Sequence, residues 1–226
     1  MVDWERTWRG NGVIAAVLFL VSYIIYGSQP KVGASAEKLV SFYDGDSTRI
    51  LISGVIFGFA VLCLMWFGAA LASVLRDAGK GGWGTAAIIA SAAIGAVLFA
   101  RIMLRGALAY SIAGSGNDEV TSALNDLLWV VIAIGWFPIA MLIMAGSFGL
   151  WRAEIISKRA FLVGVTAMVL VLLGTTTWTA DGFWALDGAY SRFIPATVML
   201  LWIAVVSGFL IRISPASTSA RAVPAA

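Results

Sequence analysis

The sequence predicts an all-α fold, a polytopic membrane bundle of six transmembrane helices, and three observations support this fold class. Of the 226 residues, 61% are hydrophobic and only 12% are charged, whereas soluble domains carry roughly 25% charged residues. The mean hydropathy is +0.94. The apolar runs repeatedly approach the ~20 residues that an α-helix needs to cross ~30 Å of hydrocarbon. A soluble globule is therefore excluded.

Six spans follow one another, separated by polar loops. The first follows a basic N-terminus but precedes no small-residue cleavage site, so we expect a retained helix rather than a signal peptide. Asp46 or Ser47 is suited to cap the second span, and Asn117 the fourth. Pro138 predicts a kink in the fourth span, since proline cannot donate to the preceding turn. The predicted spans are about 12–26, 50–75, 84–110, 127–150, 161–178 and 193–213.

Residues 1–213 are expected to form a single six-helix transmembrane domain, with no soluble domain beside it. In the polar connection 29–49, Ala36, Leu39, Val40 and Tyr43 share one face at helical spacing. This pattern predicts a short amphipathic helix that lies on the membrane surface and roofs the bundle. Residues 214–226 are small, polar and proline-containing, which predicts a flexible cytoplasmic tail.

The loop charges predict the orientation. Nine Lys and Arg residues fall on the side of the N-terminus and four on the other side, and the positive-inside rule then places the N and C termini in the cytoplasm. Eight of the twelve carboxylates gather on the opposite side. We therefore predict a multi-pass protein of a bacterial cytoplasmic membrane whose outer face is acidic.

Several chemistries are excluded by composition. The chain has no histidine, which removes His-ligated metal and haem sites and any imidazole base. No lysine lies inside a span, so a retinal Schiff base has no place to form. The lone Cys63 is expected to be a buried thiol. We expect no metal or redox cofactor, and no nucleic-acid binding, because the basic residues are scattered over short loops.

Arg101 and Arg105 are the most informative residues. They lie one helical turn apart in the third span, on the same stripe of the helix, and charge inside a bilayer is costly enough to indicate function. One interpretation is structural, with Asp126 at the start of the next span as the neutralising partner. The other is functional, because two cations and one carboxylate leave net positive charge for an anionic head group, carboxylate or phosphate. Further residues expected to rim such a site are Arg49, Arg192, Asp181 and Asp187.

Two other features have a structural and a functional interpretation. Gly54 and Gly58 form a Gly-x-x-x-Gly pair that suits close packing of a helix within the chain or in a dimer. Trp66, Trp136 and Trp202 fall inside the spans, where packing is the expected role rather than ligand binding.

The whole chain resembles a widespread bacterial family of six-span membrane proteins known only as a domain of unknown function. The likeness covers the loop Ala36-Glu37-Lys38-Leu39-Val40-Ser41-Phe42-Tyr43, the Pro-containing fourth span, and Gly149-Leu150-Trp151-Arg152. The chain departs from the family where Lys158 and Arg159 replace a proline and tryptophan. The resemblance implies the fold and no activity.

Two functions are therefore predicted, both non-enzymatic. The first is a small transporter or ligand- or lipid-binding protein whose outward-facing site centres on the arginine pair. The second is an accessory or scaffold subunit of a larger membrane complex, or a homo-oligomer, packed through the glycine pair and lipid-facing aromatic residues. Membrane lipids are expected partners in either case. An enzyme using Asp126 as a base is the third and weakest alternative, because no second catalytic group stands near it in the sequence.

Overall fold

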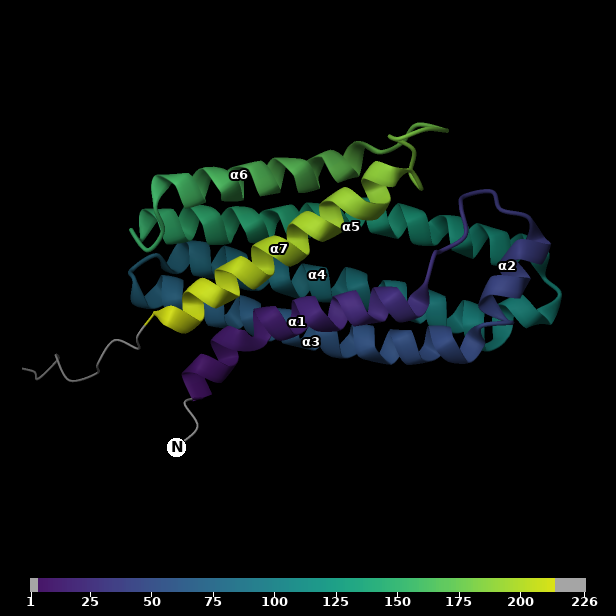
Figure 1. Ribbon diagram of the computed structural model, residues 1–226, viewed down its shortest axis with the longest axis horizontal. Coiled ribbons are helices and arrows are strands. Elements are labelled where there is room, and N and C mark those ends of the chain that lie inside the picture. The colour runs from purple at the N-terminus through teal and green to yellow at the C-terminus, as the bar shows by residue number, and fades with distance from the viewer. Residues whose placement is uncertain (1–3, 214–226) are drawn as a thin grey trace, which may run out of the picture.

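The computed structural model describes residues 4–213, and most of these residues lie in helices (Figure 1). A π-helical turn, Leu108–Ile112, and a 3-10 turn, Ala113–Ser115, extend α4, and a 3-10 turn, Gly174–Thr176, extends α6. Within the described part there is no strand beyond an isolated bridge between Thr179 and Ala185. The helices are α1 Trp4–Tyr26, α2 Ala36–Tyr43, α3 Ser47–Asp77, α4 Gly81–Ala107, α5 Asp118–Arg152, α6 Lys158–Leu173 and α7 Ala189–Arg212.

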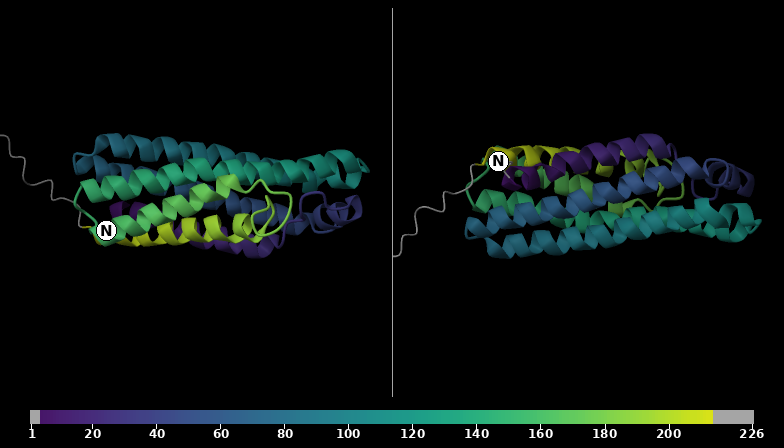
Figure 2. Two further views of the ribbon diagram at one scale, coloured as in Figure 1. Left: turned by 90° about the horizontal axis from the view of Figure 1, so that it is seen from above. Right: turned by 90° about the horizontal axis from the view of Figure 1, so that it is seen from below.

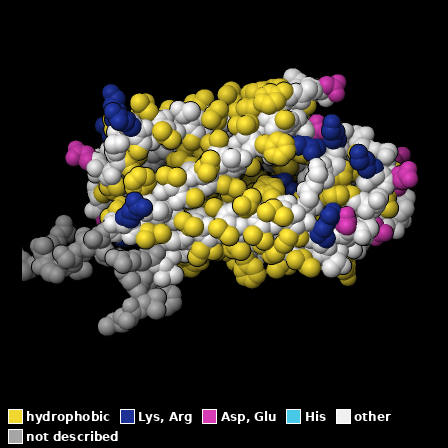
Figure 3. Space-filling model, in the orientation of Figure 1, with side chains coloured by type: hydrophobic (Ala, Val, Ile, Leu, Met, Phe, Trp, Pro, Cys, Tyr) yellow, Lys and Arg dark blue, Asp and Glu magenta, His cyan; other side chains and the backbone are white. Residues whose placement is uncertain are grey.

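Six of the helices are long and apolar enough to cross a membrane, which confirms the predicted all-α bundle and identifies a multi-pass membrane protein. Figure 3 shows hydrophobic side chains over the middle of the molecule and charged ones gathered toward its two ends. The helices extend beyond several predicted boundaries, because α3 and α5 run on past the apolar residues that mark each span.

The first helix begins and the last helix ends at the same end of the bundle, here called the terminal end (Figure 1). The Arg9 guanidinium of α1 donates to the Leu210 carbonyl of α7 at 3.3 Å, and the Val13 amide donates to the Ser207 hydroxyl at 3.3 Å. The opposite end, which carries α2, is here called the α2 end. Which end faces the cytoplasm stays a prediction, and the predicted tail lies outside the described residues.

The helices differ in length, and this difference shapes the α2 end. At 1.5 Å per residue, the 31 residues of α3 and the 35 of α5 span about 46 and 52 Å, more than the ~30 Å of hydrocarbon. Together with α4 they project beyond α1, α6 and α7 (Figure 2). The α2 helix packs on this projection with Leu39 and Tyr43 fully buried, which confirms the predicted inward apolar face. A second small core therefore forms beyond the ends of the shorter helices.

Glycines lie at two helix contacts, an ordinary one between α3 and α4 and a tight one at α1. A Cβ at Gly54 or Gly58 would lie 3.7 or 3.9 Å from Ile102 of α4, so this pair packs within the chain. A Cβ at Gly12 would lie 2.7 Å from both Phe67 and Ser207, so α1 crosses α7 tightly near the terminal end.

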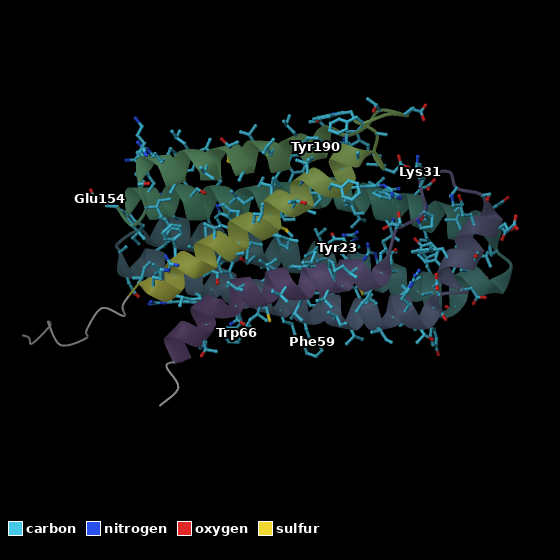
Figure 4. All side chains as sticks on the ribbon, viewed as in Figure 1. Tyr23, Lys31, Phe59, Trp66, Glu154 and Tyr190 are labelled. Carbon is cyan, nitrogen blue, oxygen red and sulfur yellow. The ribbon has the colours of Figure 1, made fainter. Side chains whose placement is uncertain are left out.

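Local predictions along the helices met mixed outcomes. The Asn117 side chain accepts from the Val120 amide at 3.3 Å, which confirms the cap, and α5 continues as one helix through Pro138. Trp136 and Trp202 are buried as predicted. Trp66 is 50% exposed and lies on the surface (Figure 4), with its ring centroid 5.1 Å from that of Trp8. Trp66 therefore packs against α1 on the surface of the bundle rather than in its core.

Candidate functional site

Arg101 and Arg105 project from α4 toward α1, and both are buried, with 6% and 4% of their surfaces exposed. One Arg101 nitrogen, Nη1, donates to the Tyr23 hydroxyl at 3.2 Å. The Arg101 Cζ lies 5.8 Å from the ring centroids of Tyr23 and of Phe57, within range of a cation–π interaction. The aromatic face of α1 and α3 therefore surrounds this guanidinium.

Arg105 lies one turn nearer the α2 end. Its Cζ stands 3.8 Å from the ring centroid of Tyr26, the last residue of α1, and its Nη2 donates to the Gln29 Oε1 at 3.3 Å. No described carboxylate forms an ion pair with either guanidinium, and the Nε atoms of both have no hydrogen-bond partner. Arg105 is thus held by a ring face and an amide, neither of which carries a negative charge.

A third guanidinium approaches from the first turn of α7. Arg192 donates from Nε to the Asp187 carbonyl at 2.7 Å, from Nη1 to the Ser28 hydroxyl at 3.3 Å and from Nη2 to the Gln29 carbonyl at 3.4 Å. Its Cζ lies 4.9 Å from the Trp129 ring centroid. Arg192 therefore joins the start of α7 to the residues that follow α1.

Residues 27–35, here called the strap, lead from α1 to α2 across the side of α5. The Asn125 amide donates to the Lys31 carbonyl at 3.1 Å, and the Trp129 indole donates to the Pro30 carbonyl at 2.9 Å. The Asp126 carboxylate accepts from the Gly33 amide at 3.2 Å, and the Asp187 carboxylate accepts from the Val32 amide at 3.2 Å. The strap is thus fixed mainly through its backbone groups.

The three arginines line one cavity of about 440 Å³. The cavity opens between α1 and α7, and Tyr23 of α1 lies at this opening (Figure 4). Atoms of basic side chains are visible inside the hollow in Figure 3. The lining comprises Leu20, Tyr23, Tyr26, Gly27, Ser28, Gln29, Arg101, Arg105, Trp129, Ile132, Trp136, Ser191, Arg192, Phe193, Ala196, Thr197 and Leu200. None of these residues is acidic.

Unpaired polar atoms concentrate around this cavity. Six buried side-chain nitrogen and oxygen atoms of the described residues lack a hydrogen-bond partner, and each belongs to a residue that lines the cavity. Buried polar groups are normally paired, so such a cluster needs an explanation. All six atoms are able to donate, which suits a ligand rich in acceptor oxygens. They are Tyr26 Oη, Gln29 Nε2, Arg101 Nε, Arg105 Nε, Trp136 Nε1 and Ser191 Oγ.

The sequence-predicted site residues divide into three groups. Arg101, Arg105 and Arg192 meet in the cavity. Asp126 and Asp187 instead hold the strap, which corrects the predicted role of Asp126 as counter-ion, because backbone amides of the strap reach its carboxylate while the arginines do not.

Arg49 and Asp181 do not line the cavity. Arg49 forms an exposed ion pair with Asp46 at 2.6 Å and stacks over Phe42 at 5.7 Å. Asp181 lies between α6 and α7, where its carbonyl accepts from the Thr179 hydroxyl at 3.2 Å. Of the four residues predicted to rim the site, only Arg192 therefore lines the cavity.

Sequence reasoning missed Tyr23, Tyr26 and Gln29. The two tyrosines lie three residues apart at the end of the first span, a spacing that puts both on one face of the helix. That spacing was the available signal. Gln29 had none, because its position depends on how the strap turns back over α5.

Comparison with known proteins identified no related protein. No family model matches the chain, no curated protein matches it, and no solved structure matches it. The resemblance to a six-span bacterial family accordingly stays a prediction.

Proposed function

We propose that this integral membrane protein is non-enzymatic and binds an anionic group, a phosphate or carboxylate, in the arginine cavity as a small transporter or ligand-binding protein. The observation that carries the proposal is the meeting of three guanidiniums in a cavity whose lining holds no acidic residue.

The energetics favour a bound anion. Burying a guanidinium away from water without a charged partner costs several kcal/mol, wherever it lies along a span. A cation–π contact returns roughly 0.5–2 kcal/mol, so the rings of Tyr23, Tyr26 and Trp129 offset only part of the cost for three cations. A phosphate or carboxylate would add charge-assisted hydrogen bonds worth about 1.5–3 kcal/mol each. The cavity is thus arranged for a negative partner.

The same lining supports a binding role rather than catalysis. General acid–base chemistry needs a group that exchanges protons near the working pH, usually a carboxylate, histidine or perturbed lysine. The lining offers arginine, tyrosine, tryptophan, glutamine, serine and threonine in their place. The scaffold alternative loses its glycine surface, since Gly54 and Gly58 already pack against Ile102.

The experiment measures binding of two probes, inorganic phosphate and short-chain phosphatidic acid, to the purified protein in a neutral detergent. Arg105→Gln should weaken binding of at least one probe roughly 10- to 100-fold, the loss expected for a charge-assisted hydrogen bond. Arg49→Gln is the matched control, because it removes a cation at the α2 end that does not line the cavity.

Size-exclusion chromatography establishes that both variants are folded, and Arg105→Lys, which keeps the charge, should bind better than Arg105→Gln. If neither probe binds the native protein, or if folded Arg105→Gln binds as the native protein does, the proposed function is refuted.

A further inference from the structure

We infer that the ligand is a phospholipid with a net negative head group and no amine, and that it reaches the cavity from the bilayer through the opening between α1 and α7. This inference rests on the proposed function and specifies its ligand and route. Four features of the structure lead to it: the depth of the arginines, the flank on which the cavity opens, the strap across its polar end, and the occupied aromatic faces.

The depth of the arginines matches that of a lipid head group. Arg105 stacks on Tyr26 at the very end of α1, and Arg192 lies in the first turn of α7. The ends of membrane-crossing helices lie near the boundary between hydrocarbon and head groups. Arg101 lies one turn, about 6 Å, deeper. The cations thus face the level at which phosphates of a bilayer leaflet reside.

The cavity opens on the flank of the bundle. The helices α1 and α7 cross tightly at Gly12 and Ser207 near the terminal end, and they diverge toward the α2 end (Figure 1). Beside the opening, Leu20 of α1 is 54% exposed and Phe193 of α7 is 63% exposed, so apolar side chains border it. Ile132, Ala196 and Leu200 continue the apolar lining inward. Acyl chains fit such a border, whereas a free hydrated anion does not.

The strap bounds the polar end of the cavity. Gly27, Ser28 and Gln29 line it there, and Arg192 ties Ser28 and Gln29 to α7. Asp126 and Asp187 hold the next strap residues by their backbone amides. The cavity is therefore polar under the strap and apolar at its flank, which is the polarity of an amphiphile with its head group innermost.

The aromatic faces argue against head groups that carry an amine. Ammonium groups of lipids are recognised by carboxylates or by open aromatic faces. No carboxylate lines this cavity, and three of its five aromatic rings, those of Tyr23, Tyr26 and Trp129, already face an arginine. Ethanolamine and choline would thus bring a cation next to three guanidiniums. Phosphatidic acid and phosphatidylglycerol avoid that repulsion, and a volume of about 440 Å³ is large enough for their head groups.

The test reconstitutes the full chain in nanodiscs and uses native mass spectrometry to count bound lipids. Phosphatidylglycerol should be retained at least ~10-fold more than phosphatidylethanolamine of the same acyl chains, a preference of the size that one buried charge contact produces. A phosphatidylglycerol analogue with a photoreactive group on its acyl chain should label α1 and α7 peptides that contain Leu20 and Leu200.

A variant at the opening separates this inference from a purely structural role of the arginines. Leu20→Trp enlarges an exposed side chain at the opening and should reduce phosphatidylglycerol retention several-fold. Leu62→Trp makes the same change at an exposed α3 position away from the cavity and should leave retention unchanged.

The outcomes also distinguish the two proposals. Binding of inorganic phosphate that depends on Arg105, without selective lipid retention or with labelling away from α1 and α7, supports the proposed function and overturns the lipid inference. Equal retention of phosphatidylethanolamine overturns the head-group selection. If the native protein binds neither inorganic phosphate nor an anionic lipid, both the proposed function and the lipid inference are overturned.

Discussion

Asn125 should be the residue on which the strap depends most. It is fully buried on α5, where its Oδ1 accepts from the Tyr43 hydroxyl at 2.9 Å while its Nδ2 donates to the Lys31 carbonyl at 3.1 Å. One side chain therefore joins α2, α5 and the strap. Asn125→Ala removes both bonds, together with a third from Nδ2 to the neighbouring Asp126 carboxylate at 3.2 Å, and leaves the Tyr43 hydroxyl without an acceptor.

The expected cost follows from these contacts. Three lost hydrogen bonds cost about 1 kcal/mol each, and an unpaired buried hydroxyl costs roughly 1–3 kcal/mol more, so Asn125→Ala should lower the free energy of unfolding by about 4–6 kcal/mol. Tyr43→Phe should cost less, because it removes a single bond. In the double variant Tyr43→Phe with Asn125→Ala, the unpaired hydroxyl is gone and the shared bond is lost only once, so the total should fall short of the sum by about 2–4 kcal/mol.

Reversible unfolding in mixed micelles measures these free energies, and hydrogen exchange reports on the strap. Amides of residues 27–35 should exchange faster in Asn125→Ala, while those of α6 should not. Two results would contradict this role of Asn125: stability losses of the two single variants that add up to that of the double variant, or a loss of under about 1 kcal/mol in the free energy of unfolding for Asn125→Ala.

The same pair predicts a pH dependence. Burial raises the pKa of Tyr43, so its hydroxyl remains a neutral donor in the folded protein. A raised folded-state pKa makes the contribution of the hydroxyl fully present below the ordinary tyrosine pKa of about 10 and lowers it as the pH rises above that value. The coupling between Tyr43 and Asn125 should therefore be constant near neutral pH.

Three further predictions concern packing and topology. Gly146→Ala should destabilise the fold by about 1–3 kcal/mol, because its Cβ would lie 2.7 Å from the Trp202 ring, whereas Gly208→Ala meets no atom within 4 Å and should be neutral or stabilising in the same unfolding assay. Pro138→Ala should leave the folded state intact and raise stability, since α5 continues through this position; a large loss on denaturation would show that the proline is needed for packing. In a cysteine-free background, Lys38→Cys should react with an impermeant thiol reagent added outside intact cells and Lys80→Cys should not; the reverse pattern would invert the predicted orientation.

The fold could be predicted because the bilayer leaves few choices. Apolar runs of ~20 residues must be helical in hydrocarbon, so the existence and order of six spans follow from composition. The helix ends were less predictable, because Ile50 and the turns from Leu108 to Ser115 pack with Leu39 and Tyr43 of α2 in the second small core. This tertiary packing leaves no separate apolar run in the sequence. The predicted end of the third span at Tyr110 accordingly falls inside the π-helical turn.

The site was predictable in its charge and not in its partners. Arg101 and Arg105 stood out because lone cations in a span are rare. Asp126 was matched to them by its nearness in sequence and its estimated depth, but which side of a helix meets which neighbour depends on how α5 rotates against the strap. In the orientation that α5 adopts about its own axis, Asn125 and Asp126 face the backbone of the strap and Trp129 faces Arg192. No local pattern specifies it.

The charge balance of the cavity changes what the arginines require. With Asp126 as a partner, two guanidiniums would have left one positive charge unpaired. The structure brings in Arg192 and directs Asp126 to a backbone amide, so three positive charges meet with no carboxylate in the lining. Ring faces and amides stabilise cations without cancelling their charge, and three like charges around a space of about 440 Å³ repel one another. A ligand with a negative phosphate removes that repulsion, which is why binding and stability should rise together when phosphatidylglycerol is added.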